Sequence, residues 1–221
     1  MAVRDRFREA VECALEDGFA AIPFPDGSRP HLEQALKQRI GSVTSTSLSI
    51  KSEEEARPNS LSAKYGAGEF PHHTDFAFRP YPPRLIALIN ETDEAYDRST
   101  AVTRFVDLPE KLLELHANTL WNLKTRAGSF VIGGTTSIGD HNIRRWDIEF
   151  LTPHNGIAHL VAEKIPEVFS KLETIHKWEP RSAVLVDNWN CTHSRGVTQG
   201  GDDKNRRLLR LEAWHHAGMD N

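Results

Sequence analysis

The first fifty residues alternate between helical and extended hydrophobic patterns. Apolar side chains in residues 5–15 recur at the three- and four-residue spacing of an amphipathic helix, and Gly18 can end that helix. Residues 19–24 then predict a short strand, and residues 31–40 return to helical spacing. The β-branched side chains of residues 43–50 predict either a strand or part of a long loop.

Beyond residue 80 the pattern is mainly that of strands. Short apolar or alternating runs predict strands at 84–89, 100–108, 120–126, 130–132, 144–150, 181–186 and 208–214. Helical spacing returns in residues 155–173, where Pro166 predicts a break or kink. Residues 133–140 are hydrophilic and rich in glycine, which predicts a flexible loop. These elements predict a mainly β fold with flanking helices.

Composition narrows the class of protein. The 221 residues are long enough for one domain with a substantial core. The net charge of −4 gives no basic surface for nucleic acid, and no apolar run approaches the roughly 20 residues that span a bilayer. Two cysteines, Cys13 and Cys191, favour a reducing compartment over a disulfide scaffold, and the charged N-terminus is not a secretory signal. We therefore expect a cytoplasmic protein, and the sequence leaves open whether it forms a homo-oligomer.

The segment Phe70-Pro71-His72-His73-Thr74-Asp75-Phe76 carries the most informative side chains. Residues at i and i+2 of an extended chain point to the same side, so the imidazole of His73 and the carboxylate of Asp75 face one spot. A surface pair is the usual explanation for such a spacing. His193 supplies a third candidate ligand far downstream. Two histidines and one carboxylate form the facial set that suits non-haem Fe(II) and leaves three coordination positions open.

Two arginines follow in the apolar strand at the C-terminal end. Arg206 and Arg210 are four residues apart, so a strand places both on one face. An arginine that faces a core is costly unless it meets an anion. The combination of His-x-Asp, a distant His and core-facing Arg is more specific than any of its parts.

This constellation resembles the Fe(II)/2-oxoglutarate-dependent oxygenases of the taurine-dioxygenase and clavaminate-synthase-like group. The matching segments are His73-Thr74-Asp75, the run from Asp187-Asn188-Trp189 to His193-Ser194-Arg195, and Arg206 with Arg210. The likeness runs from about residue 60 to residue 214. It implies a double-stranded β-helix, a jelly-roll barrel, in one domain. Residues 1–59 would pack on a barrel core of residues 60–214 that includes a lid insertion.

The resemblance also implies roles for individual residues. His73, Asp75 and His193 would bind Fe(II), and Arg206 with Thr103 would hold the distal carboxylate of 2-oxoglutarate, leaving one metal position for O2. Arg210 and Arg195 are candidates for an acidic group of a small-molecule substrate. Ser62 and Tyr65 lie just before the metal segment and would border the substrate pocket; an ordinary loop is the alternative for them.

The implied reaction is oxidation of a small polar metabolite, such as an amino acid or a derivative, with release of succinate and CO2. Relatives that halogenate carry Ala or Gly in place of the carboxylate ligand, so Asp75 favours hydroxylation, or a related desaturation or cyclisation. Two alternatives stay open: a cupin-like metal-dependent lyase or isomerase, and a non-catalytic binding barrel. Arg206 and Thr103 argue against the lyase, which needs no dicarboxylate anchor, and the intact triad argues against the binding module.

Overall fold

Five strands form the larger sheet of the computed structural model, which describes residues 3–49, 64–66, 68–125, 128–196 and 206–215. All neighbouring strands in this sheet are antiparallel. Their order is β1 (Phe19–Pro23), β12 (Ser182–Asp187), β4 (Leu85–Asn90), β14 (Arg207–His215) and β2 (Gly41–Ser49). The β-branched segment near residue 45 is therefore a strand, β2, up to Ser49.

The two faces of the larger sheet bury different apolar clusters. In β4, Leu85, Ala87 and Ile89 pack with the helices α1 (Val3–Asp17) and α2 (Arg29–Arg39). Ile86 and Leu88 point to the opposite face, where the second sheet lies. Because successive strand residues face opposite sides, a strand covered on both faces is apolar throughout, as the sequence of β4 is.

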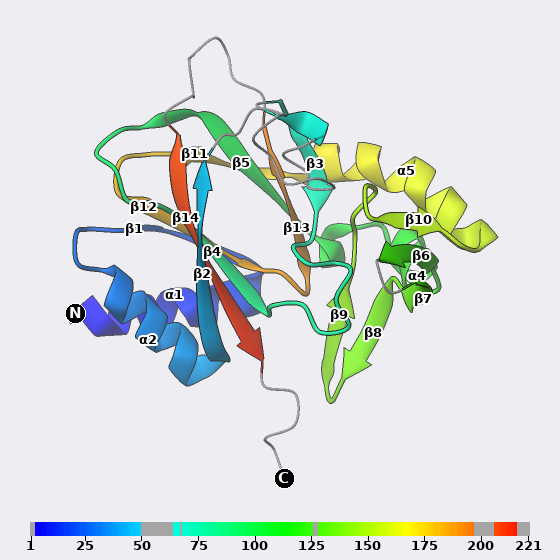
Figure 1. The fold of residues 1–221 in the computed structure, drawn as a ribbon, viewed down its shortest axis with the longest axis horizontal. Coiled ribbons are helices and arrows are strands. Elements are labelled where there is room, and N and C mark those ends of the chain that lie inside the picture. Colours follow the sequence, from blue (N-terminus) through cyan, green and yellow to red (C-terminus); the bar gives the residue numbers. More distant parts are fainter. Residues whose placement is uncertain (1–2, 50–63, 67, 126–127, 197–205, 216–221) are drawn as a thin grey trace.

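The second sheet carries the candidate site. It contains four antiparallel strands, in the order β11 (Thr174–Trp178), β5 (Tyr96–Arg104), β13 (Cys191–Arg195) and β3 (Phe70–His73). Val102, Trp178 and Cys191 from this sheet pack against Val184 and Leu208 of the larger sheet. The two sheets thus enclose an apolar interior between them (Figure 1).

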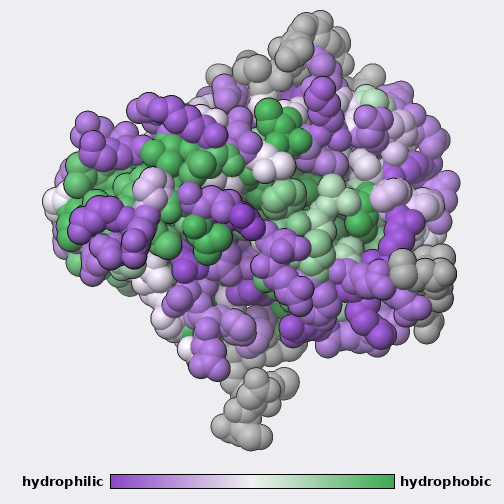
Figure 2. Space-filling view, turned by 180° about the vertical axis from the view of Figure 1, so that it is seen from behind, coloured by the Kyte–Doolittle hydropathy of each residue, from purple (hydrophilic) through white to green (hydrophobic). Residues whose placement is uncertain are grey.

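A third layer lies beside the four-stranded sheet. The helices α4 (Glu110–Ala117) and α5 (Gly156–Leu172) pack with a small sheet of β10 (Leu151–Pro153), β6 (Leu120–Thr125) and β7 (Gly128–Gly133). A short helix, η1 (Phe105–Asp107), lies between β5 and α4 in the chain. The strands β8 (Thr135–Ile138) and β9 (His141–Arg144) pair with each other. Viewed from behind, this side exposes apolar side chains among polar ones (Figure 2), and the large exposed apolar residues there include Phe130, Val131 and Leu160.

The mainly β prediction is confirmed. The described strands form four separate sheets, which are not closed into a barrel. No helix among the described residues is long and apolar enough to cross a membrane.

Two local predictions were wrong, and the third, a break or kink at Pro166, was wrong as to the break. Residues 133–140 are not a loop, since most of them belong to the β8–β9 hairpin. The strand predicted for residues 144–150 stops at Arg144, because the Asp147 carboxylate accepts hydrogen bonds from the backbone N–H groups of Glu149 and Phe150 and closes a turn. Helix α5 continues through Pro166, and its buried face offsets the missing hydrogen bond.

Candidate metal centre

The antiparallel pairing of β3 with β13 brings the two candidate histidine ligands together. His73 lies directly opposite His193 in the ladder, and His193 lies opposite Val102 of β5. Residues that face each other across an antiparallel pair project from the same side of the sheet. Both imidazoles therefore point to the inner face, between the two sheets, as Val102 does.

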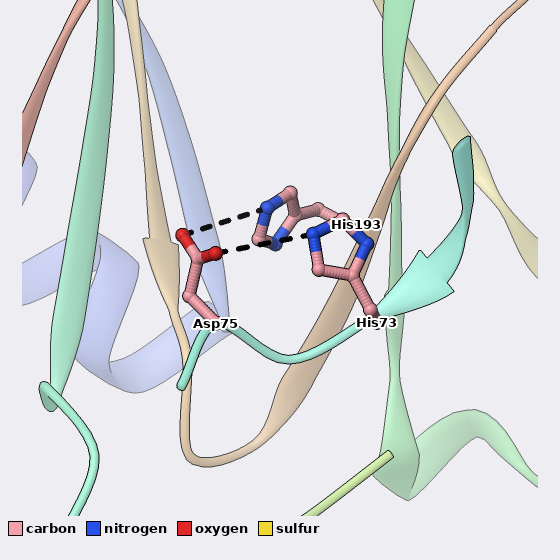
Figure 3. A group of neighbouring side chains, drawn as sticks. All are labelled: His73, Asp75 and His193. Carbon is pink, nitrogen blue, oxygen red and sulfur yellow. Dashed lines mark ion pairs between the residues drawn. The ribbon is translucent and has the colours of Figure 1, made fainter. Parts of the chain in front are cut away.

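The three predicted ligands converge on one spot (Figure 3). Nε2 of His73 is 3.9 Å from Oδ1 of Asp75, and Nε2 of His193 is 3.8 Å from Oδ2. The ligand atoms of the three residues all lie within 4.8 Å of one another, and the imidazole centroids are 4.5 Å apart. Two nitrogens and one carboxylate at this spacing form the donor set that non-haem Fe(II) uses.

Both imidazoles direct Nε2 to this spot. Nδ1 of His73 donates to the backbone carbonyl of Pro71 at 2.9 Å, and this bond fixes the tautomer and the ring orientation. Burial lowers the pKa of His193 to about 3, so this side chain is neutral near pH 7. The buried Nδ1 of His193 has no hydrogen-bond partner among the described residues. The two imidazoles thus offer ring nitrogens that suit a metal ion.

Asp75 lies beyond β3 and is held by both its backbone and its side chain. The amide of Asn188 accepts from the Asp75 N–H at 2.7 Å and donates to the Asp75 carbonyl at 3.0 Å. Nη1 of Arg210 is 3.1 Å from each carboxylate oxygen. Burial acts to raise the pKa of this carboxyl, but the charge and hydrogen bonds of the adjacent Arg210 guanidinium lower it, and the pKa lies below its ordinary value. Asp75 is therefore an anionic donor.

The Asp187-Asn188-Trp189 segment stabilises the metal-site residues through contacts with the loop after Asp75. Asp187 forms an ion pair with Arg84 at 2.9 Å and accepts the backbone N–H of Trp189 at 3.0 Å. Nε1 of Trp189 donates to the carbonyl of Pro82, and Asn188 donates to that of Pro83. This segment therefore ties the loop after Asp75 to the start of β13. Its contacts position Asp75 and the strand that carries His193.

The structure separates the two residues expected to hold the distal carboxylate of 2-oxoglutarate. Arg206 is buried just before β14, with its Cζ 5.9 Å from the centroid of Trp178. Thr103 lies opposite Thr192 and donates to the carbonyl of Phe169 in α5, on the outer face of the sheet. Thr103 is thus not placed with Arg206.

Thr100, unlike Thr103, lies on the inner face of the sheet. It lies opposite Arg195 in the ladder, so it shares the inner face with His193 two residues away. Its hydroxyl accepts a hydrogen bond from Nε1 of Trp178 at 3.1 Å, and the same indole lies beside Arg206. Thr103 is three positions beyond Thr100, so the two side chains face opposite sides of the strand, and only the strand register shows which one faces inward.

The other residues expected to contact substrate have protein partners. Arg195 donates to the carbonyls of Gly66 and Gly68 and stacks on Phe70, so it holds the segment before β3. The Tyr65 hydroxyl donates to Glu149, and its ring is edge-on to Phe70, which in turn is edge-on to His73. Ser62 lies outside the described residues.

A further carboxylate lies near His73. Asp147 is 5 % exposed, and burial raises its pKa, while the nearby His73 and the N–H groups of Glu149 and Phe150 act in the opposite direction. Trp146, the preceding residue, accepts a backbone hydrogen bond from Thr74 at 2.7 Å, which anchors this turn to the metal segment. The sequence offered one signal for this residue, the Arg-x-Asp spacing of Arg145 and Asp147.

The chain's sequence matches no protein-family model and no curated protein. Solved structures share its fold over most of its length. Asparagine oxygenase in complex with Fe(II), 3-hydroxyasparagine and succinate is 13 % identical, with a TM-score of 0.69 over 96 % of this chain and 79 % of that chain. The non-heme iron oxygenase OrfP with Fe and alpha-ketoglutaric acid is 16 % identical, with a TM-score of 0.61 over 96 % and 79 %.

A third similar structure is PvcB, an Fe, alpha-ketoglutarate dependent oxygenase from an isonitrile synthetic pathway. It is 15 % identical, with a TM-score of 0.57 over 95 % of this chain and 80 % of that chain. The fold that the sequence resemblance implied is confirmed: the chain has the double-stranded β-helix of these iron oxygenases.

The geometry predicts that His73→Gln abolishes metal binding while His72→Gln retains it. The two imidazoles are adjacent in sequence, but His72 points to the outer face, where it contacts Thr192 and Glu173. Loss of a hydrogen bond to a ligating histidine costs about 10–100-fold in affinity, so loss of the ligand itself costs more than about 100-fold. Titration of each apoprotein with Co(II) measures this, and equal affinities for the two variants would contradict the site.

Proposed function

We propose that the chain is an Fe(II)- and 2-oxoglutarate-dependent oxygenase that hydroxylates an amino acid or a derivative of one. The observation that carries this proposal is the convergence of His73, Asp75 and His193 on the inner face of this fold. Bound Fe(II) would couple the oxidation of 2-oxoglutarate to succinate and CO2 with the oxidation of the substrate by O2. The residues of the chain hold and orient the reactants.

The metal ligands leave room for a chelating co-substrate. The two Nε2 atoms and one Asp75 oxygen would hold the ion from one side and leave its other side for the reactants. Fe(II) bound in this way would supply a site for a chelating 2-oxo acid and for O2. The carboxylate ligand at Asp75 occupies the position that a halide would need, which favours hydroxylation over halogenation.

Arg206 and Thr100 are the proposed partners of the distal carboxylate of 2-oxoglutarate. A guanidinium binds a carboxylate with two parallel hydrogen bonds, and a threonine hydroxyl adds a third donor. Trp178 contacts both of these side chains. Thr100 lies on the inner face, two residues from Val102, which is the ladder partner of His193, and this place supports Thr100 in the role that the sequence suggested for Thr103.

Asp147 is the proposed partner of the substrate's amino group. It is a buried carboxylate close to His73, and its described hydrogen bonds come from backbone N–H groups. A buried carboxylate of this kind favours a cationic partner. The similar structures include an asparagine oxygenase and complexes of OrfP with hydroxylated L-Arg, which supports an amino acid as the substrate class. Tyr65 and Glu149 would border the same pocket.

Three broader expectations also belong to this proposal. The chain would act as one domain, in the cytoplasm, on a small molecule. A homo-oligomer is compatible with the apolar surface around Phe130 and Val131, both of which are about half exposed.

The proposed reaction predicts slow formation of succinate from 2-oxoglutarate without any substrate. The wild type, loaded with Fe(II) under anaerobic conditions and then exposed to O2, should form succinate, and His73→Ala should form none. Stimulation by members of a panel of amino acids would then identify the substrate. Succinate formation that is equal in both proteins would contradict the proposal.

Once an amino acid substrate is known, Asp147→Asn should raise its KM by roughly 30-fold or more, because truncating one partner of a buried ion pair costs about 2–5 kcal/mol. The matched control is Asp140→Asn, which removes an exposed carboxylate from the β8–β9 turn. A KM for Asp147→Asn that equals the control's would remove Asp147 from the pocket.

Thr100→Val should raise the KM for 2-oxoglutarate about tenfold or more, because a hydrogen bond to a charged group contributes about 1.5–3 kcal/mol. Thr103→Val makes the same change three residues away on the outer face and should leave this KM within about twofold. The opposite ranking of the two variants would restore Thr103 to the co-substrate site.

A further inference from the structure

A row of polar side chains runs along the inner face of the larger sheet towards Asp75. In the ladder between β14 and β2, Arg210 lies opposite Thr46 and Glu212 lies opposite Thr44. Opposite residues share one side of the sheet, so these four side chains adjoin one another. Glu212 is 5 % exposed, and its register partner on β4 is Ile86 of the apolar interior. A carboxylate at such a position needs specific partners.

Glu212 and Asp75 hold the Arg210 guanidinium from two sides. Oε1 of Glu212 accepts from Nε of Arg210 at 2.9 Å and lies 2.8 Å from its Nη2. Nη1 of the same guanidinium lies 3.1 Å from both Asp75 oxygens. The hydroxyls of Thr44 and Thr46 donate to Oε2 and Oε1 of Glu212, at 2.7 and 3.2 Å. A continuous chain of contacts therefore links strand β2 to a metal ligand.

Arg210 by itself would weaken the binding of a metal ion by Asp75. A guanidinium that contacts both oxygens of Asp75 orients the carboxylate, but its charge repels a divalent cation at the same oxygens. Glu212 opposes that charge from the far side of the guanidinium. Glu212 also fixes the plane of the guanidinium, because Nε and Nη2 both contact its carboxylate. Asp75 is thus held in one orientation, and its affinity for a metal ion is reduced less than it would be by Arg210 alone.

We propose that Glu212 is a positioning residue of the metal centre. It holds Arg210 against Asp75, offsets the guanidinium charge and so keeps the Asp75 carboxylate turned towards the two imidazoles and able to bind the ion. This inference rests on the metal centre of the proposed function. It assigns Arg210 to Asp75, whereas the sequence suggested a contact with an acidic group of the substrate.

The test is a double-mutant cycle on metal affinity, which requires neither substrate nor turnover. Apoproteins of the wild type, Glu212→Gln, Arg210→Gln and the double variant are titrated with Co(II), with its visible absorption recorded as a measure of the ligand field. Glu114→Gln, at an exposed carboxylate on α4, controls for the loss of one negative charge. Circular dichroism of each apoprotein establishes that it is folded.

Glu212→Gln should weaken Co(II) binding about tenfold or more and change the absorption spectrum, as loss of an outer partner of a metal ligand typically does. The double variant should differ from Arg210→Gln by less than about twofold in Co(II) affinity, because Glu212 acts through Arg210. If Glu212→Gln does not fold, Thr44→Ala serves instead, since it removes a donor to Glu212 at an exposed position and should weaken binding about threefold.

Two results would overturn this inference alone: an affinity for Glu212→Gln equal to that of Glu114→Gln, or the same loss with and without Arg210. A wild type that binds no Co(II) would overturn the metal centre together with it.

Discussion

The pairing of His73 with His193 across β3 and β13 is the constraint on which the site depends. These residues are far apart in sequence, and a shift of one position in the ladder would send one imidazole to the outer face with His72. The register is held by neighbours that do not bind a metal. Asn188 fixes the backbone of Asp75, and the ion pair between Arg84 and Asp187 braces the segment that precedes β13.

Between the two sheets, an apolar region adjoins a polar one. Val102, Val184 and Leu208 fill the apolar part, whereas Asp75, Arg210 and Glu212 form a line of alternating charge towards the imidazoles. Such a line is stable only because each buried charge meets an opposite one. The same balance leaves Asp75 anionic and aimed at the ligand nitrogens.

Continuous apolar runs in the sequence predicted β4 and β12 correctly. The His-x-Asp spacing pointed to a shared site, although Asp75 lies beyond the end of β3 rather than within a strand. The sequence could not specify what strand register decides. Thr100 and Thr103 are equally plausible by type, but only the pairing with β13 shows which one faces inward. The turn at Asp147 and the role of Glu212 depend on partners that are distant in sequence.

The most direct measurement is the visible absorption of the Fe(II)-loaded protein as 2-oxoglutarate is added without O2. Chelation of Fe(II) by the 2-oxo acid produces a charge-transfer band, and the account predicts that this band appears and saturates with one equivalent bound per chain. A protein that binds Fe(II) but develops no band at saturating 2-oxoglutarate would contradict it. In that case the co-substrate does not chelate the metal, and the metal-dependent lyase or the binding barrel would be the better interpretation.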